Sequence, residues 1–273
     1  ASFGMITVGL MNIFVVGRLS RAEEEQGHTD LLLTSVVGRH APVAAALIVG
    51  VALNLVVGAV VAATLVGQGL PTPGSVLLGA GFAALGLVFT GVTLVAAQIS
   101  ENTRVVYGSA GAVLGLTYLL RALGDVGDGR LSWLSPIGWS QKTRPFAGDV
   151  PWPLALSLAA AAGCIGIAAL LTARRDIGAG LVPPRPGPPR AGRGLTTPLG
   201  LAVRLQRGTL VGWTVGMALM GLAWGAVGKD IDEFVGENQE LAEVFARSGM
   251  TLTDSYFTYA LLLSAIMAGG YTI

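Results

Sequence analysis

Three consecutive carboxylates lie in the first polar segment of the sequence. Glu23, Glu24 and Glu25 follow Arg21 and lie in a polar segment, residues 18–40, between two apolar runs. Carboxylates beside arginines form charge-assisted hydrogen bonds with basic groups of another molecule. We therefore expect this acidic segment (residues 18–40) to lie in water at a membrane surface, where a partner can bind it. The alternative is that its charges only keep the segment in water.

Other reactive side chains are isolated from one another. His28 and His40 both lie in the acidic segment, and Cys164 lies in an apolar run and cannot form an internal disulfide. The residues nearest to a phosphate-binding loop, 223–230 (AWGAVGKD), lack its first glycine and its final serine or threonine. The sequence therefore predicts no catalytic residue, no metal site and no cofactor in this chain, so that energy for any work has to come from a partner.

The composition is that of an integral membrane protein. Of 273 residues, 52% are hydrophobic and 12% are charged, whereas soluble domains contain about 25% charged residues. The net charge of +1 argues against nucleic acid as a partner. The lipid bilayer is the expected environment.

Apolar runs of the length that crosses a bilayer recur along the whole chain. A membrane-spanning helix needs about 20 mostly apolar residues. The sequence therefore predicts an all-α, polytopic bundle of about seven transmembrane helices. They are expected at residues 2–17, 41–66, 75–98, 105–123, 152–173, 208–228 and 253–273. Because the chain begins and ends inside such runs, we expect it to be an internal piece of a longer polypeptide.

Arginines indicate which loops face the cytoplasm. Loops on the cytoplasmic side carry an excess of Lys and Arg. The segment 174–207 is the richest in arginine, and the predicted spans place it on the same side as residues 18–40. Both segments are therefore predicted to be cytoplasmic. The loop 124–151 and residues 229–249 are predicted to lie on the opposite, external side. Residues 229–249 are predicted to form an amphipathic helix with an acidic, solvated face.

A proline- and arginine-rich linker at residues 181–195 divides the chain. Such a composition favours an extended, semi-rigid spacer. We interpret 1–180 as the latter part of one membrane unit and 196–273 as the start of a second. The second begins with a short amphipathic helix at residues 196–207.

Aromatic residues gather in and just after the external loop 124–151. Their amphipathic rings suit the boundary between lipid and water. Two interpretations remain open: the loop forms a lid on the membrane surface, or its rings only anchor the chain at the interface. The residues are Trp133, Trp139, Phe146 and Trp152.

Ionisable residues are lacking in the middle of the predicted spans. Buried ionisable groups usually mark proton or ion coupling, so a path through these helices suits a large apolar or amphipathic solute better. Candidate path residues are the polar Asn54, Thr93, Gln98 and Tyr118. Asn54 either faces such a path or forms a hydrogen bond with a neighbouring helix.

Glycines at regular spacing predict where helices pack closely. The repeats singled out are Gly111 and Gly115, the series Gly208, Gly212 and Gly216, and the pair Gly221 and Gly225. Ordinary helix packing and a sliding interface that rearranges during transport are both consistent with these repeats.

Several motifs carry a family resemblance. Residues 21–39 (RAEEEQGHTDLLLTSVVGR) resemble the pattern R-x-E-E-x-x-G-x-x-E-L-L-L-x-x-P-V-x-R of ABC-2 type exporter permeases. Residues 131–149, 174–188 and 204–213 resemble the actinobacterial exporter of polyketide antibiotics, or tetronasin-type, group. The chain departs from the pattern with Asp30 in place of Glu and with Val36 in place of Pro.

The resemblance implies a permease of two six-helix halves in a bacterial plasma membrane. It would extrude hydrophobic or amphipathic drug-like or antibiotic-like molecules by alternating access. Two copies of an ABC ATPase subunit, which bind ATP and Mg, would drive it. This chain would hold spans two to six of the first half and the first two of the second. A secondary transporter or channel without an ATPase is the alternative, and a membrane enzyme is a weaker third.

The same resemblance implies that the acidic segment contains a coupling helix that docks into the ATPase. The implied docking residues are Arg21, Glu23, Glu24, Glu25, Gly27, Asp30 and Arg39.

Overall fold

The computed structural model describes residues 2–27, 38–126, 129–176, 178–182, 192, 195, 197–237, 258, 261, 262 and 265. For residues 2, 126, 219, 220 and 222–237 it describes the backbone alone. The chain divides into two compact units, Ala1–Arg185 and Pro186–Ile273. Each is described by itself below.

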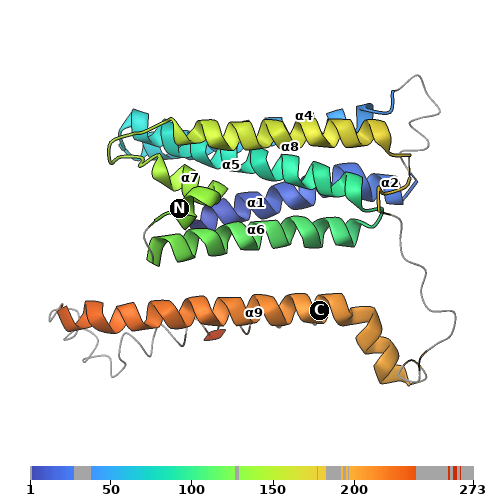
Figure 1. Cartoon of the computed structure of the whole chain (residues 1–273). Helices are drawn as coiled ribbons and strands as arrows, with labels where there is room; N and C mark the ends of the chain where they lie inside the picture. Colours follow the sequence, from blue (N-terminus) through green and yellow to red (C-terminus); the bar gives the residue numbers. More distant parts are fainter. Residues whose placement is uncertain are drawn as a thin grey trace. The chain divides into compact units, whose positions relative to one another are not determined.

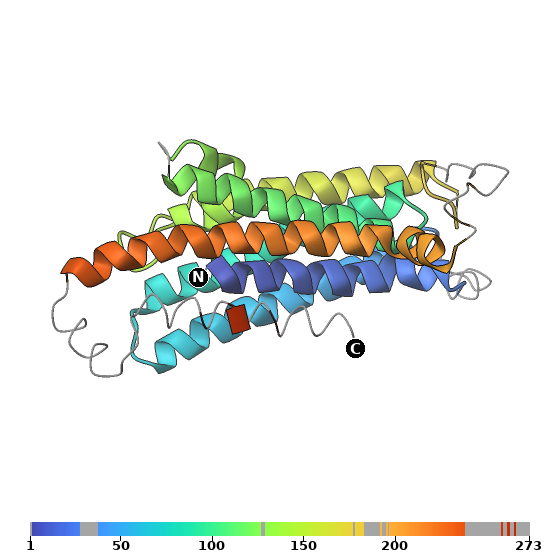
Figure 2. The same cartoon turned by 90° about the horizontal axis from the view of Figure 1, so that it is seen from below.

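The described residues are helical and contain no β-strand. The elements are α1 (Ser2–Gly17), η1 (Arg18–Ala22), α2 (Glu23–Glu25), α4 (Ala41–Gly67), α5 (Thr72–Ile99), α6 (Thr103–Val126), η2 (Leu131–Leu134), α7 (Pro136–Lys142), α8 (Pro153–Arg174) and α9 (Pro198–Glu237). All but α9 lie in the first unit, where the long helices run side by side (Figures 1 and 2).

Five helices in the described part of the chain are long and apolar enough to cross a membrane. They are Phe3–Glu25, Ala41–Gly67, Thr72–Ile99, Thr103–Asp125 and Pro153–Arg174. The first five predicted spans are therefore confirmed to within a few residues, except that the first helix runs further than expected. The sixth predicted span lies within α9. The seventh lies almost entirely outside the described residues.

Prolines set the starts of several of these helices. Pro42, Pro73 and Pro153 each occupy the first turn of their helix. A proline there costs no hydrogen bond, because the first-turn N–H groups have no partner within the helix, and its fixed φ suits the helical backbone.

The first helix continues through the arginines that were expected to end it. After Gly17 the backbone forms a π-helical turn, η1, and then α2. Gly17 keeps helical angles of φ −63° and ψ −38°, and the sequence RLSRAEEE contains no residue that interrupts a helix. The turn ends at Gly27, whose φ of +77° is readily adopted only by glycine. The three glutamates therefore continue the first helix. The coupling helix expected in the acidic segment remains a prediction, and residues 28–37 lie outside the described residues.

Helix α5 occupies the centre of the first unit. In its most apolar window 72% of the residues are buried, against 17–44% in the other four spans. Its glycines permit this burial, because neighbouring helices approach where a side chain would not fit. At the contact with α4, a Cβ on Gly58 would lie 2.8 Å from the carbonyl oxygen of Gly79.

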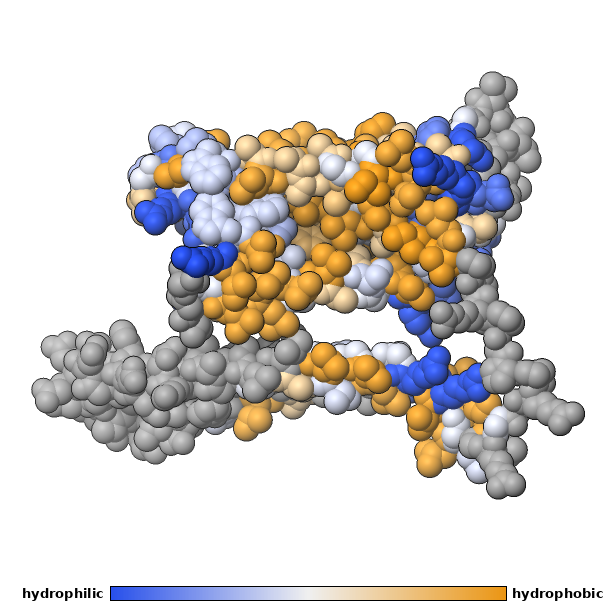
Figure 3. Space-filling view, viewed as in Figure 1, coloured by the Kyte–Doolittle hydropathy of each residue, from blue (hydrophilic) through white to orange (hydrophobic). Residues whose placement is uncertain are grey.

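The two ends of this bundle differ from its middle in polarity. In the first unit, hydrophobic residues cover the middle and hydrophilic residues gather at both ends (Figure 3). Helix α2 lies at one end and α7 at the other (Figure 1). This distribution is that of a body that crosses the apolar layer along its helix axes.

The second unit differs from the expected division into three helical pieces. A single helix, α9, runs from Pro198 to Glu237 and so joins the predicted short helix 196–207, the span 208–228 and the first part of the external helix 229–249. No proline interrupts this stretch, and glycine alone weakens a helix without ending it. The remainder of 229–249 lies outside the described residues.

Candidate functional site

Glu24 is bound inside the chain on both of its carboxylate oxygens. Its Oε2 accepts from Arg175 Nη2 at 2.6 Å and lies 3.0 Å from Arg21 Nη1. Its Oε1 accepts from the backbone N–H of Gly178 at 2.7 Å. The side chains of Glu24 and Arg175 are each 8% exposed and that of Arg21 is 1% exposed. We call this cluster of Arg21, Glu24 and Arg175 the Glu24 junction.

The Glu24 junction also holds the residues that follow α8, which we call the α8 tail (residues 178–182). Arg21 donates from Nη2 to Gly178 O at 3.0 Å and from Nη1 to Ala179 O at 3.3 Å. Arg175 donates from Nη1 to Ala179 O at 3.0 Å and to Ala97 O of α5 at 3.4 Å. A guanidinium presents several N–H groups in one plane, so each arginine can span several acceptors.

Other residues of the acidic segment also bind their own chain. Glu25 accepts at 2.9 Å from the backbone N–H of Thr103, the first residue of α6, where a carboxylate is favourable because the helix dipole is positive. Arg39 donates to Ala173 O near the end of α8 at 3.1 Å. Gly27 ends the helical turn.

The predicted docking residues are therefore only partly displayed to solvent. Arg21, Glu24, Glu25 and Arg39 are brought together with α6 and α8 of the same chain, and Glu23 is half-buried. Asp30 lies outside the described residues. A docking role for this group remains a prediction. Within the first unit, the structure agrees with the prediction that the acidic segment lies at the same end as the arginines that end α8.

Arg175 is the residue of this site that the sequence did not single out. It was counted only as one of several cytoplasmic arginines. Two features of the sequence could have identified Arg175. It directly follows an apolar span, and it lies at the same predicted end of the spans as the three glutamates.

A second polar cluster joins three helices inside the apolar part of the bundle. Asn12 of α1 and Asn54 of α4 exchange hydrogen bonds at 2.9 and 2.8 Å. Thr90 of α5 donates from Oγ1 to Asn12 Oδ1 at 2.8 Å, and all three side chains are fully buried. Asn54 therefore bonds with neighbouring helices, the second of its two interpretations. Asn12 was missed, although an amide inside an apolar span was the same signal that identified Asn54.

The other predicted path residues make their contacts elsewhere. Thr93 and Gln98, both buried in α5, donate to carbonyls of the preceding turn, Phe89 O and Leu94 O. Tyr118 of α6 is half-buried and packs against the main apolar core. The structure does not gather these residues around Asn54, and their role in a substrate path remains a prediction.

The external loop packs into the end of the bundle and also carries an aromatic surface. Ile137 of α7 is fully buried in the main core, together with residues of α1, α5 and α6. At the surface, Trp133 and Trp152 stack with ring centroids 5.2 Å apart, and Lys142 Nζ lies 4.9 Å from the Trp133 ring centroid. Trp139 Nε1 donates to Trp133 O. The loop is thus partly buried in the bundle and carries exposed rings at its surface. Its roles as a lid or as an interfacial anchor both remain predictions.

Phe146 fastens the same loop to the start of α5. Its backbone N–H donates to Asp149 Oδ1 at 2.9 Å, and its ring lies where a side chain at Gly74 would project. The φ of Phe146 is +66°, a conformation that costs free energy for a residue with a side chain. In this conformation the ring packs against Gly74.

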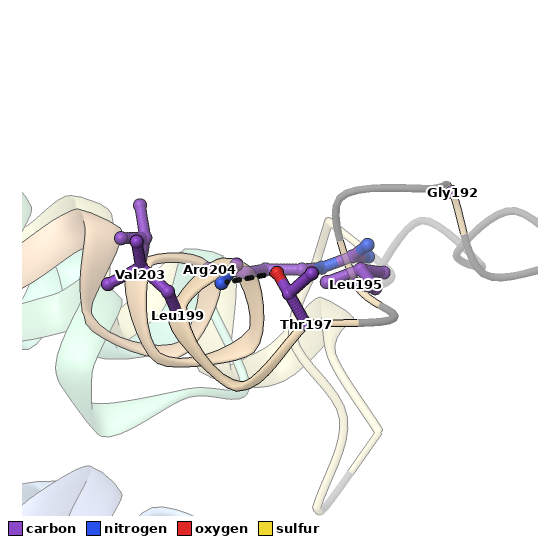
Figure 4. A pocket seen from close by; sticks show the side chains of 7 residues that line it. Gly192, Leu195, Thr197, Leu199, Val203 and Arg204 are labelled. Atoms are coloured by element: carbon purple, nitrogen blue, oxygen red, sulfur yellow. Dashed lines mark hydrogen bonds between the residues drawn. The ribbon is translucent and has the colours of Figure 1, made fainter.

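In the second unit, a shallow, open hollow lies at the beginning of α9 (Figure 4). Thr197 Oγ1 accepts from the backbone N–H of Gly200 at 3.2 Å and caps the helix. Leu199 and Val203 are 75% and 49% exposed beside Arg204. The hollow fits the expected amphipathic surface better than an enclosed ligand site. Elsewhere in the described ranges, no group of three or more histidine, cysteine or carboxylate side chains could hold a metal ion.

Comparisons with known proteins found similarity to a bacterial permease. Over 263 residues the chain is 42% identical to the multidrug efflux system permease protein Rv1217c of Mycobacterium tuberculosis, an alignment that covers 96% of this chain and 48% of the relative. Residues 195–273 match the family model described as the C-terminal domain of the multidrug efflux system permease Rv1217c. The chain thus spans about half the length of the curated relative that it matches. With its five apolar helices, it is a multi-pass membrane protein and a homologue of a bacterial efflux permease.

Proposed function

We propose that the chain forms part of the membrane-spanning permease of an ATP-driven exporter of the ABC-2 type. A separate ABC ATPase, present in two copies with ATP and Mg, would bind near the acidic segment. Hydrophobic or amphipathic molecules would leave the cell by alternating access. The observation that carries this proposal is the 42% identity over nearly the whole chain to an efflux permease.

The distribution of ionisable residues favours transport that is powered by a partner protein outside the lipid bilayer. Helices α4 and α5 contain no ionisable residue, and the ionisable side chains of α8 are Arg174 at its end and Cys164. The buried charges of the described residues cluster at the α2 end, in the Glu24 junction. Proton-coupled transporters usually place carboxylates inside their spans, so a nucleotide-driven partner is the better source of energy.

The test is transport by the purified full-length protein in proteoliposomes with its co-expressed ATPase. Uptake of a fluorescent hydrophobic cation, such as ethidium, is measured in proteoliposomes whose ATPase faces the outer solution, with ATP and with a non-hydrolysable analogue. We expect ATP-dependent uptake that a protonophore leaves unchanged. The control is an ATPase whose P-loop lysine is replaced by alanine, which should abolish uptake. Uptake driven by a proton gradient without ATP would instead establish a secondary transporter.

A further inference from the structure

The end of α8 contacts the acidic segment at two places, one on each side of residues 28–37. Before them, Glu24 accepts from Arg175 Nη2 and from Gly178 N. After them, Arg39 donates to Ala173 O. Two residues of the acidic segment that are far apart in the sequence, Glu24 and Arg39, are therefore both fastened to the carboxyl end of α8 and its tail.

The α8 tail is in turn fastened to α5, the central helix. The backbone N–H groups of Leu181 and Val182 donate to Gln98 O at 3.2 Å and to Ile99 O at 3.0 Å. The fit is close at Gly180, where a Cβ would lie 2.8 Å from Ile99 O. A displacement of the tail therefore acts on the end of the most buried helix of the bundle.

Arg175 is the residue that joins these contacts. One guanidinium nitrogen binds Glu24, and the other binds Ala97 O of α5 and Ala179 O of the tail. The pair is almost fully buried, so water screens it little, and the loss of one partner would leave an uncompensated charge. The contact between Glu24 and Arg175 is thus suited to keep a fixed geometry, so that the acidic segment and the end of α8 move together.

We propose that Arg175 is a positioning residue that transmits movement of the acidic segment to α8 and, through the α8 tail, to α5. The inference rests on the proposed function, because the movement would come from the docked ATPase. Glu24 acts in this scheme as the internal partner of Arg175 and not as a contact to the ATPase. Loss of Arg175 should therefore affect coupling more than assembly.

The experiment uses the full-length protein reconstituted with its ATPase. Three variants are compared with wild type: Arg175→Gln, Glu24→Gln and the matched control Arg174→Gln, which removes an exposed charge from the neighbouring position. Three quantities are measured: ATPase bound per permease, ATP hydrolysed, and ethidium transported per ATP. A merely structural role would lower all three together, whereas a positioning role lowers the third.

We expect Arg175→Gln and Glu24→Gln to keep the bound ATPase within about twofold of wild type and to lose about tenfold in transport per ATP, a factor that corresponds to about 1.4 kcal/mol. Arg174→Gln should match wild type. Equal transport per ATP in Arg175→Gln and Arg174→Gln would overturn the inference and leave the proposed function intact. Wild-type transport without ATP would overturn both.

A second variant covers the case in which Arg175→Gln does not yield folded protein. Arg175→Lys keeps the charge but cannot span Glu24 and the two carbonyls at once, because a lysine lacks the planar fork of donors. It should fold and still lose transport per ATP, by about threefold or more. Full transport per ATP in Arg175→Lys would contradict the inference.

Discussion

Asn12 and Asn54 exchange two side-chain hydrogen bonds, of 2.9 and 2.8 Å, between the first two long helices of the bundle. Each amide donates one bond and accepts the other, and each also donates to a carbonyl one turn back in its own helix. Thr90 of α5 completes the cluster through Asn12 Oδ1. Three helices are thus joined by buried polar groups in an apolar setting.

Replacement of Asn54 by alanine should destabilise the protein. Asn12 and Thr90 would lose a partner in a region where water does not replace it. Interhelical hydrogen bonds in membranes contribute about 0.6–2 kcal/mol, and we expect a loss of about 1–2 kcal/mol in resistance to unfolding in detergent. The control is Thr93→Val, because the hydroxyl of Thr93 donates to Phe89 O within its own helix. A loss no larger than that of Thr93→Val would contradict the interhelical role.

Replacement of Gly86 by alanine should disturb the same cluster from α5. A Cβ at this position would lie 2.6 Å from Asn54 Cγ and 2.8 Å from Asn12 Nδ2, closer than non-bonded atoms tolerate. We expect a loss of about 1–3 kcal/mol, the usual cost of overpacking. Gly163→Ala is the control, since nothing lies within 4 Å of its Cβ position. Thermal unfolding in detergent measures both, and equal midpoints would show that the close approach is absent.

Replacement of Ser135 by alanine should loosen the external loop. The buried Ser135 Oγ donates to Thr117 O of α6 at 2.6 Å and accepts from the N–H of Gly138, which caps α7. Loss of a cap typically costs about 1 kcal/mol. Limited proteolysis of the loop should therefore become faster. Ser109→Ala, which removes a bond within one helix, should leave the rate unchanged; acceleration in both variants would argue against a specific cap.

The sequence predicts the spans well because hydropathy is a local property. The runs at 41–66 and 152–173 lie within one or two residues of α4 and α8. The first span was placed too short, because charged residues were taken as its end while the backbone remains helical through Glu25. Charge marks where a chain meets water, whereas a helix ends where a residue such as Gly27 interrupts it.

The contacts within the site were less predictable because they depend on packing. Glu24 and Arg175 are 151 residues apart. No local sequence pattern around either residue predicts that the two form a pair. Glycine spacing was similarly ambiguous. Among the described residues, no neighbouring element comes within 4 Å of the Cβ positions of Gly111 and Gly115, whereas Gly58 and Gly79 lie at a close helix contact. A glycine shows where a helix can approach, and the neighbouring helix decides whether it does.

The most direct test of the account is a double-mutant cycle on Glu24 and Arg175 in the full-length protein. Unfolding in detergent is measured for wild type, Glu24→Gln, Arg175→Gln and the double variant. Residues in direct contact show interaction energies of about 0.5–3 kcal/mol, and because this pair is buried we predict about 1–3 kcal/mol. The same cycle with Arg174→Gln should be additive. An Arg175 cycle that is additive within about 0.3 kcal/mol would contradict the claim that α8 holds the acidic segment in place.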